Sequence, residues 1–240
     1  ELPVRPGYQV EPEAVTADLP KAARLFEANG LEISSVAGYL DEATVMACGD
    51  SGVPILRTMC RIDPKLGFTR TIEDYHRTFE GLIPALERAN VTIGVQNHSG
   101  YFIGSAAGML YLLDRYDPKH VCAVLDMAHC AVAGEPVELA VDILWSRLNG
   151  LVNFKSAYQH RVNGPEEPEA KFKIRWTSCH HAAYSWREFF NALMARGFSG
   201  TICLPTEYSD PEGKPQRMGD DVMYYLREDL AYLGALIETR

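Results

Sequence analysis

Residues 121–134 read VCAVLDMAHCAVAG, an apolar run that ends in a carboxylate at Asp126 and an imidazole at His129. A continuous apolar run of this length is typical of a strand buried on both faces of a parallel sheet. In parallel α/β proteins, ligands bind at the C-terminal ends of such strands. The segment therefore predicts a buried strand whose far end places Asp126 and His129 at a functional site.

Apolar segments of the same kind alternate with amphipathic helical segments along the rest of the chain. We expect strands at 31–39, 53–60, 91–99, 121–129, 151–158, 171–178 and 200–210, and helices at 20–30, 71–90, 105–117, 136–149, 185–197 and 220–238. Strands that alternate with helices indicate βαβ units and a parallel sheet. A (β/α)8 TIM barrel, of the α/β class, fits a chain of 240 residues with this many units. An open doubly wound sheet is the alternative.

The start of the chain bears on the first strand of this barrel. Residues 1–5, ELPVR, resemble only the end of a strand, so we expect a first strand that is truncated at the N-terminus. No repeat or low-complexity linker divides the sequence. We therefore expect a single domain over residues 1–240.

Composition narrows the class of protein. The chain is 47% hydrophobic, which allows a sizeable core, and its net charge of −9 disfavours nonspecific binding to nucleic acid. Its 6 cysteines form no CxxC pair and are interpreted as reduced thiols of a cytoplasmic protein. No apolar run is long enough to span a membrane, so no membrane partner is expected. The segment 220–238 is expected to pack on the barrel wall or on a second subunit, which makes a homo-oligomer possible.

Polar side chains collect at the expected strand ends. They are Glu1, Arg57, Gln96, Asn97, His98, Asp126, His129, Asn153, Lys155, His160, Arg161, His180, His181 and Glu207. Strand ends converge on one mouth of a barrel. A mixture of carboxylates, imidazoles and cations at that mouth suits a polar substrate with several hydroxyl groups.

Four segments, VQNHSG (95–100), VLDMAH (124–129), VNFKSAYQHR (152–161) and GFSGTICLPTEY (197–208), follow one another in an informative order. In this order they resemble the xylose-isomerase-like TIM-barrel superfamily, which contains the sugar phosphate isomerases and epimerases. The resemblance covers nearly the whole chain. It implies an isomerase or epimerase that acts on a small carbohydrate or keto-sugar by proton transfer at the C-terminal barrel mouth. It also implies one divalent metal, Mn²⁺, Mg²⁺ or Zn²⁺, as the electrophile.

The resemblance implies roles for individual residues of the chain. Asp126 matches a metal-ligating aspartate, and His129 matches a histidine that faces the substrate. His98 and Arg161 match substrate-contacting positions. The other candidates for substrate contact are Arg57, Asn153 and His160.

Other positions depart from the family pattern. Gln96 stands where a ligand glutamate is expected, Lys155 lies near the place of a histidine, and Pro205 occupies the usual position of the last glutamate. Glu207 lies two residues further on and shares the face of that strand. Two interpretations remain open. Either Asp126, Glu207 and the Gln96 amide oxygen still hold a metal, with His160 as a further candidate ligand, or the Lys155 ammonium replaces it. In both interpretations, Asp126, His129, Lys155 and Glu207 are the catalytic candidates.

The sequence leaves two other functional classes as alternatives. The altered positions are also compatible with a barrel that binds a sugar-like ligand, or serves as a partner subunit, without catalysis. A DNA-repair nuclease related to endonuclease IV needs more metal ligands and a basic surface, which the charge of −9 disfavours. A glycine-rich helix start at 104–108 is a candidate phosphate site.

Overall fold

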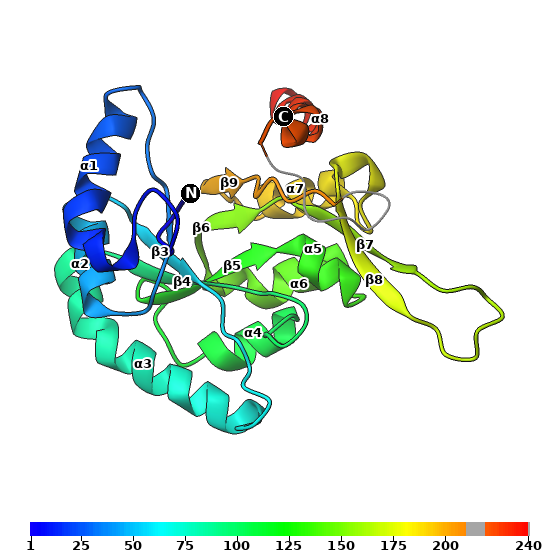
Figure 1. Ribbon diagram of the computed structural model, residues 1–240, viewed down its shortest axis with the longest axis horizontal. Coiled ribbons are helices and arrows are strands. Elements are labelled where there is room, and N and C mark those ends of the chain that lie inside the picture. Colours follow the sequence, from blue (N-terminus) through cyan, green and yellow to red (C-terminus); the bar gives the residue numbers. More distant parts are fainter. Residues whose placement is uncertain (210–218, 240) are drawn as a thin grey trace.

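The computed structural model describes residues 1–209 and 219–239. Its main sheet is parallel throughout, in the order β1-β2-β3-β4-β5-β6-β9. The strands are β1 (Leu2–Pro3), β2 (Val36–Ala37), β3 (Ile55–Thr58), β4 (Thr92–Gln96), β5 (Val121–Asp126), β6 (Leu148–Asn153) and β9 (Thr201–Cys203). The sheet curls so that its edge strands, β1 and β9, approach the same region (Figure 1). This curled parallel sheet confirms the TIM-barrel class, with a short first strand.

Helices cover the outer face of this sheet (Figure 1). The α-helices of the described residues are α1 (Val15–Glu27), α2 (Glu42–Asp50), α3 (Phe68–Ala89), α4 (Ala106–Leu113), α5 (Met127–Val132), α6 (Val137–Leu144), α7 (Trp186–Ala195) and α8 (Met223–Glu238), of which α5 lies beside β7 and α8 lies apart from the sheet. Helices that follow one another around the barrel are in contact: α1 with α2, α2 with α3, α4 with α6, and α6 with α7. In the described residues, no helix has the length and apolar character that a membrane crossing requires.

Local sequence explains where several helices begin. The side chains of Asp41, Ser105 and Ser185 accept hydrogen bonds from the backbone N–H three residues on, at the starts of α2, α4 and α7. Such caps satisfy amides that have no partner within the helix. These caps therefore fix the first residue of α2, α4 and α7.

The barrel interior is narrow at the centre of the sheet. A Cβ atom added to Gly94 of β4 would lie 2.8 Å from Val124 Cγ2 and 2.9 Å from Ile55 Cγ2. All six residues of β5 are buried. The apolar run that begins at Val121 therefore fills the core, and only the end of its strand is free to carry polar chemistry.

Five elements differ from the sequence predictions. Strand β5 ends at Asp126, and His129 lies in helix α5 because Asp126 caps that helix. The segment predicted as a strand at 171–178 forms β8 (Phe172–Thr177), which pairs antiparallel with β7 (Ser156–Arg161). This hairpin projects from the barrel instead of joining its sheet (Figure 1). Helix α2 was missed, and the predicted strand at 31–39 is regular only at Val36–Ala37. The predicted strand at 200–210 is regular only at Thr201–Cys203, and residue 210 lies outside the described residues.

Candidate active site at the barrel mouth

Asp126 is fixed at the end of β5 by contacts on every side. Its backbone N–H donates to Asn97 Oδ1 at 2.8 Å, and its carbonyl accepts from Asn97 Nδ2 at 3.0 Å. Its Oδ1 accepts from the Ala128 N–H at the start of α5, at 3.2 Å. Its Oδ2 accepts from Gln96 Nε2 at 2.8 Å. The carboxylate is therefore fully buried but well supplied with donors.

Lys155 follows β6 and brings the charges of the site together. Its Nζ lies 2.9 Å from Glu207 Oε2 and 3.4 Å from Asp126 Oδ2. It also lies 3.1 Å from His129 Nε2 and 4.2 Å from the centre of the Trp176 ring. Lys155 is only 4% exposed. An ammonium so deeply buried needs partners of this kind to stay charged. We call Asp126, His129, Lys155 and Glu207 the Lys155 cluster.

The environment of the cluster sets the charges of its members. Burial disfavours ionisation of Asp126, but the attraction of Lys155 outweighs it and holds the pKa of this carboxyl below its usual value. Burial lowers the pKa of His129 to about 3, and Lys155 adds to that effect. The Ser99 backbone nitrogen lies 3.1 Å from His129 Nδ1, while the Lys155 ammonium faces the other ring nitrogen. A neutral imidazole can accept from the Lys155 ammonium at Nε2 and donate from Nδ1 to the Ser99 hydroxyl, 3.1 Å away, whereas an imidazolium would turn an N–H toward the ammonium.

A second ion pair continues the network toward β1. The guanidinium of Arg57 donates to both carboxylate oxygens of Glu1, through Nε at 2.5 Å and Nη2 at 2.8 Å. Its Nη1 donates to Gln96 Oε1 at 2.6 Å. Because arginine only donates and a carboxylate only accepts, Gln96 must turn its oxygen to Arg57 and its nitrogen to Asp126. Gln96 thus joins the two ion pairs.

A cavity of about 480 Å³ lies above this network, between the two edge strands of the sheet. Its lining includes Glu1, Arg57, Gln96, His98, Asn153 and Glu207, together with residues 203–206 at the end of β9 and directly after it. The side chain of Glu207 is 38% exposed. Glu207 is therefore the member of the Lys155 cluster that a ligand in this cavity can touch directly.

Within the part of the chain that the structure describes, the donor set of the site lacks the ligands that a divalent ion requires. Among the described residues, no group of three or more His, Cys, Asp or Glu side chains could hold a metal. The Lys155 ammonium lies between the carboxylates of Asp126 and Glu207, and Gln96 presents an N–H to Asp126 rather than an oxygen. This arrangement does not fit a divalent ion. The interpretation that Asp126, Glu207 and Gln96 are metal ligands is unsupported by the geometry.

The structure gathers most of the predicted site residues but not all of them. Asp126, His129, Lys155, Glu207, Gln96, Arg57, Asn153 and His98 lie together, and the His98 and His129 rings are 4.0 Å apart. Two candidates lie instead in the β7–β8 hairpin. Arg161 donates to Asn163 Oδ1 and the Glu167 carbonyl, and His160 accepts from Arg175 Nε. Both stand outside the lining of the cavity.

The remaining candidates also lie elsewhere. His180 contacts Tyr232 of α8, and His181 lines a separate pocket with Tyr158 and Arg175. The candidate phosphate site at 104–108 is already occupied, because the Ala106 N–H at the start of α4 donates to the carboxylate of Glu135.

Two supporting residues of the site escaped prediction. Ser99 holds the His129 ring, and the Tyr184 hydroxyl donates to the Lys155 carbonyl at 2.8 Å. Ser99 directly follows the QNH triplet at 96–98, which was a usable signal. Tyr184 comes from a loop before α7, and nothing in its local sequence indicates that it reaches Lys155.

Comparison with known proteins places this geometry in a family. The model of the xylose isomerase-like TIM barrel matches residues 1–229, and the chain therefore belongs to that family. Among curated proteins, none matches the sequence.

Solved structures share the fold at low sequence identity. The 3-keto-D-glucoside 4-epimerase of E. coli is 14% identical, with a TM-score of 0.63 over 95% of this chain and 90% of that chain. A D-tagatose 3-epimerase-like protein is 14% identical, with a TM-score of 0.70 over 99% of this chain and 89% of that chain. A barrel from Mycobacterium smegmatis, solved in complex with magnesium, is 12% identical, with a TM-score of 0.62 over 89% of this chain and 76% of that chain.

Proposed function

We propose that this chain is a sugar isomerase or epimerase that moves a proton on the carbon beside the carbonyl group of a keto-sugar. The observation that carries the proposal is the ion pair between Lys155 and Glu207, 2.9 Å long, on the floor of the mouth cavity. It combines a carboxylate that a ligand can reach with a buried positive charge directly beneath it. Proton abstraction beside a carbonyl needs both of these elements.

The step assigns one role to each member of the cluster. Glu207 takes the proton as the C–H bond breaks, and the electron pair moves toward the carbonyl oxygen to give an enediolate. The charge of Lys155 stabilises this negative charge and remains on the ammonium throughout. Asp126 and neutral His129 hold Lys155 in place. Return of the proton from Glu207 to the former carbonyl carbon, while a hydroxyl proton moves between the two oxygens of the enediolate, gives isomerisation. Epimerisation requires that water on the opposite face of the original carbon supplies the proton instead.

The family and its solved structures support the substrate class. Structures that share the fold include an L-ribulose 3-epimerase and a D-psicose 3-epimerase solved with D-fructose. The proposal differs from a metal-assisted mechanism in one respect: Lys155 is the source of positive charge, because the donor set does not fit a divalent ion.

One observation favours a second candidate, a barrel that binds a sugar-like ligand without catalysis. The charges of Asp126 and Lys155 satisfy each other below the cavity, and neither residue belongs to its lining. In that case Glu207 would serve as a hydrogen-bond acceptor for sugar hydroxyl groups, and the carbon-bound protons of the ligand would not exchange.

Deuterium exchange separates the two candidates. The protein is incubated in D₂O with D-allulose, L-ribulose or a 3-keto-D-glucoside, in buffer with EDTA, and proton NMR follows the signal of the carbon beside the carbonyl. We expect exchange in at least one substrate. Glu207→Gln should lower its rate by about 10²- to 10⁴-fold, since it removes the base but keeps the shape.

The matched control is Glu166→Gln, an exposed glutamate in the hairpin loop that should leave the rate unchanged. Exchange that appears only after Mn²⁺ is added would overturn the role of Lys155. Binding of a keto-sugar without exchange would support the non-catalytic candidate. Absence of both exchange and binding would overturn both candidates.

A further inference from the structure

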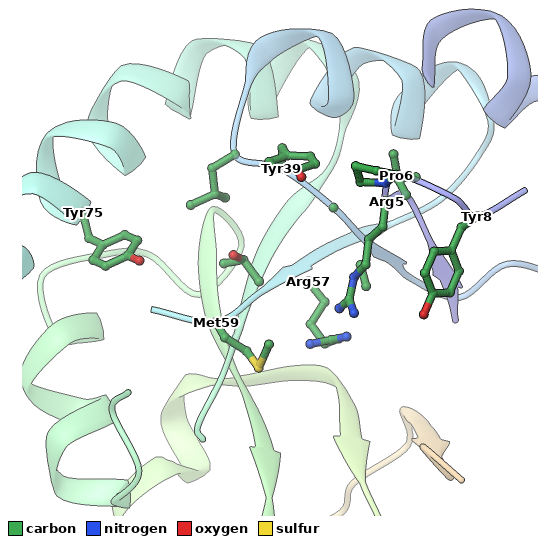
Figure 2. A pocket seen from close by; sticks show the side chains of 12 residues that line it. Arg5, Pro6, Tyr8, Tyr39, Arg57, Met59 and Tyr75 are labelled. Carbon is green, nitrogen blue, oxygen red and sulfur yellow. The ribbon is translucent and has the colours of Figure 1, made fainter. Parts of the chain in front are cut away.

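A second cavity of about 530 Å³ opens beside the first, over the ends of β1, β2 and β3. The two cavities share the lining residues Arg5, Tyr8, Ala37, Arg57 and Met59, so they are continuous. Figure 2 shows the guanidinium groups of Arg5 and Arg57 pointing into the same part of this space. We call this second space the Arg5 cavity.

The described lining of the Arg5 cavity is rich in donors and poor in acceptors. It contains two arginines and three tyrosines but no aspartate, glutamate, asparagine or glutamine. The chain as a whole has a net charge of −9, whereas this lining holds two cations and no acid; the carboxylate of Glu1, which pairs with Arg57, lies in the lining of the first cavity. Its charge thus differs in sign from that of the protein.

The two arginines differ in what they already bind. Arg57 is held by both oxygens of Glu1, which balance its charge. Arg5 is exposed and makes no ion pair or side-chain hydrogen bond within residues 1–209 and 219–239. In the same described part of the chain, the hydroxyl groups of Tyr8 and Tyr39 also lack a hydrogen-bond partner. One guanidinium and two phenols are therefore available to a ligand.

These available groups define the chemistry of that ligand. Arginine offers a planar set of N–H donors and no acceptor, and it matches the paired oxygens of a phosphate or carboxylate. A neutral sugar would leave the charge of Arg5 unpaired when the cavity fills and water is displaced. An anionic group would pair with it and could accept from Tyr8 or Tyr39 as well.

The size and lining of the space argue against a free small anion. Volumes of about 300–1,000 Å³ are typical of sites for whole organic ligands. The lining also contains apolar surface from Leu40, Met59 and the tyrosine rings, which suits a carbon skeleton. Because the cavity joins the space above Glu207, one molecule can occupy both.

We propose that the substrate is an anionic keto-sugar, a sugar phosphate or a sugar acid, whose charged group is bound by Arg5 while its carbonyl end lies at Glu207. This inference rests on the proposed function, since it names the substrate class of the same site. Tyr8 and Tyr39 add hydrogen bonds to the anion, and Arg57, whose charge Glu1 balances, lies at the boundary between the two cavities.

Calorimetric titration tests the inference with three probes of similar carbon skeleton. They are D-fructose 6-phosphate, 5-keto-D-gluconate and neutral D-fructose, each titrated into the full chain. We expect at least one charged probe to bind at least tenfold more tightly than D-fructose. The better of the two charged probes identifies the anion as phosphate ester or carboxylate. Raising the salt concentration should weaken the binding of the charged probe and leave the affinity for D-fructose nearly unchanged.

The variant Arg5→Met removes the charge and keeps a side chain of similar length. This variant should bind the charged probe at least tenfold more weakly than the parent does, and D-fructose less than twofold more weakly. The matched control is Arg24→Met, at an exposed arginine of α1 outside both cavities, which should bind like the parent. Equal affinities for all three probes, an unchanged affinity in Arg5→Met, or no binding of any probe would overturn the inference.

The outcome is separable from that of the proposed function, because calorimetry requires no turnover. Tight binding through Arg5 without deuterium exchange would leave this inference standing and overturn the catalytic proposal. Exchange in a neutral ketose with no preference for charged probes would do the reverse.

Discussion

The Lys155 cluster and the Arg5 cavity both contain cations, but the environments of these cations are opposite. Lys155 is buried between two carboxylates, a neutral imidazole and the Trp176 ring, so its charge is already paired in the folded structure. Arg5 is exposed and unpaired within the described part of the chain. The first arrangement is part of the folded structure, and the second is free for a ligand. A substitution at the buried members of the cluster, Asp126 and Lys155, should therefore affect stability as well as activity, and one at Arg5 should affect binding alone.

The largest effect is expected from Lys155→Met. It leaves the Asp126 carboxylate fully buried without its cation, and breaking a buried ion pair in this way costs about 3–5 kcal/mol. Guanidinium-induced unfolding measures the loss. The control Lys119→Met removes an ammonium that is 66% exposed in its ion pair, and should cost at most about 1 kcal/mol. The double variant Lys155→Met/Asp126→Asn should recover part of the loss; a single-variant loss below about 1 kcal/mol would contradict the buried pair.

A smaller loss in the free energy of unfolding is expected when the pH is lowered. His129 has its pKa lowered to about 3, so the folded state stays unprotonated where the unfolded state, with an ordinary pKa near 6.5, takes up a proton. Stability is therefore present above the unfolded pKa and falls as pH drops, by about 2 kcal/mol between pH 7 and pH 5. The lowered pKa of Asp126 adds a loss of the same sign at still lower pH.

Unfolding curves at pH 7, 6 and 5 test this expectation. His129→Gln should remove the slope in this window, whereas His181→Gln, at an exposed ring, should keep it. A His129→Gln protein with the same pH dependence as the parent would show that the imidazole is not the group responsible.

The same contrast explains how much of the fold and of the site could be predicted from the sequence. The strand at 121–126 and most of the cluster were predictable, because apolar runs mark barrel strands and their ends converge on one mouth. The position of His129 in α5 was not, since the capping of that helix by Asp126 appears only in three dimensions. The β7–β8 hairpin was also missed: its strands have barrel-like composition, and only pairing partners distinguish them. Arg5 and Tyr8 look like ordinary surface residues until the neighbouring strands enclose a space around them.

Glu207 lies at the boundary between the two regions and should behave accordingly. Its side chain is 38% exposed, so its ion pair with Lys155 is partly screened by water. We expect Glu207→Gln to lower the free energy of unfolding by no more than about 1 kcal/mol, because Asp126 still balances Lys155. Unfolding curves beside those of Glu166→Gln give the comparison. A loss as large as that in Lys155→Met would place Glu207 within the structural core and weaken its role as a base.

The smallest effect on stability is expected from Arg5→Met. Substitutions of exposed, unpaired side chains usually change the free energy of unfolding by less than about 0.5 kcal/mol, and Arg5 has no ion pair to lose within residues 1–209 and 219–239. A thermal melt of Arg5→Met beside Arg24→Met measures the difference without ligand. In the presence of a charged probe, the parent and Arg24→Met should gain thermal stability, because a ligand that binds the folded state stabilises it. Arg5→Met should gain less. An Arg5→Met protein already destabilised without ligand would mean that the guanidinium supports the fold, and the contrast between the two regions would then fail.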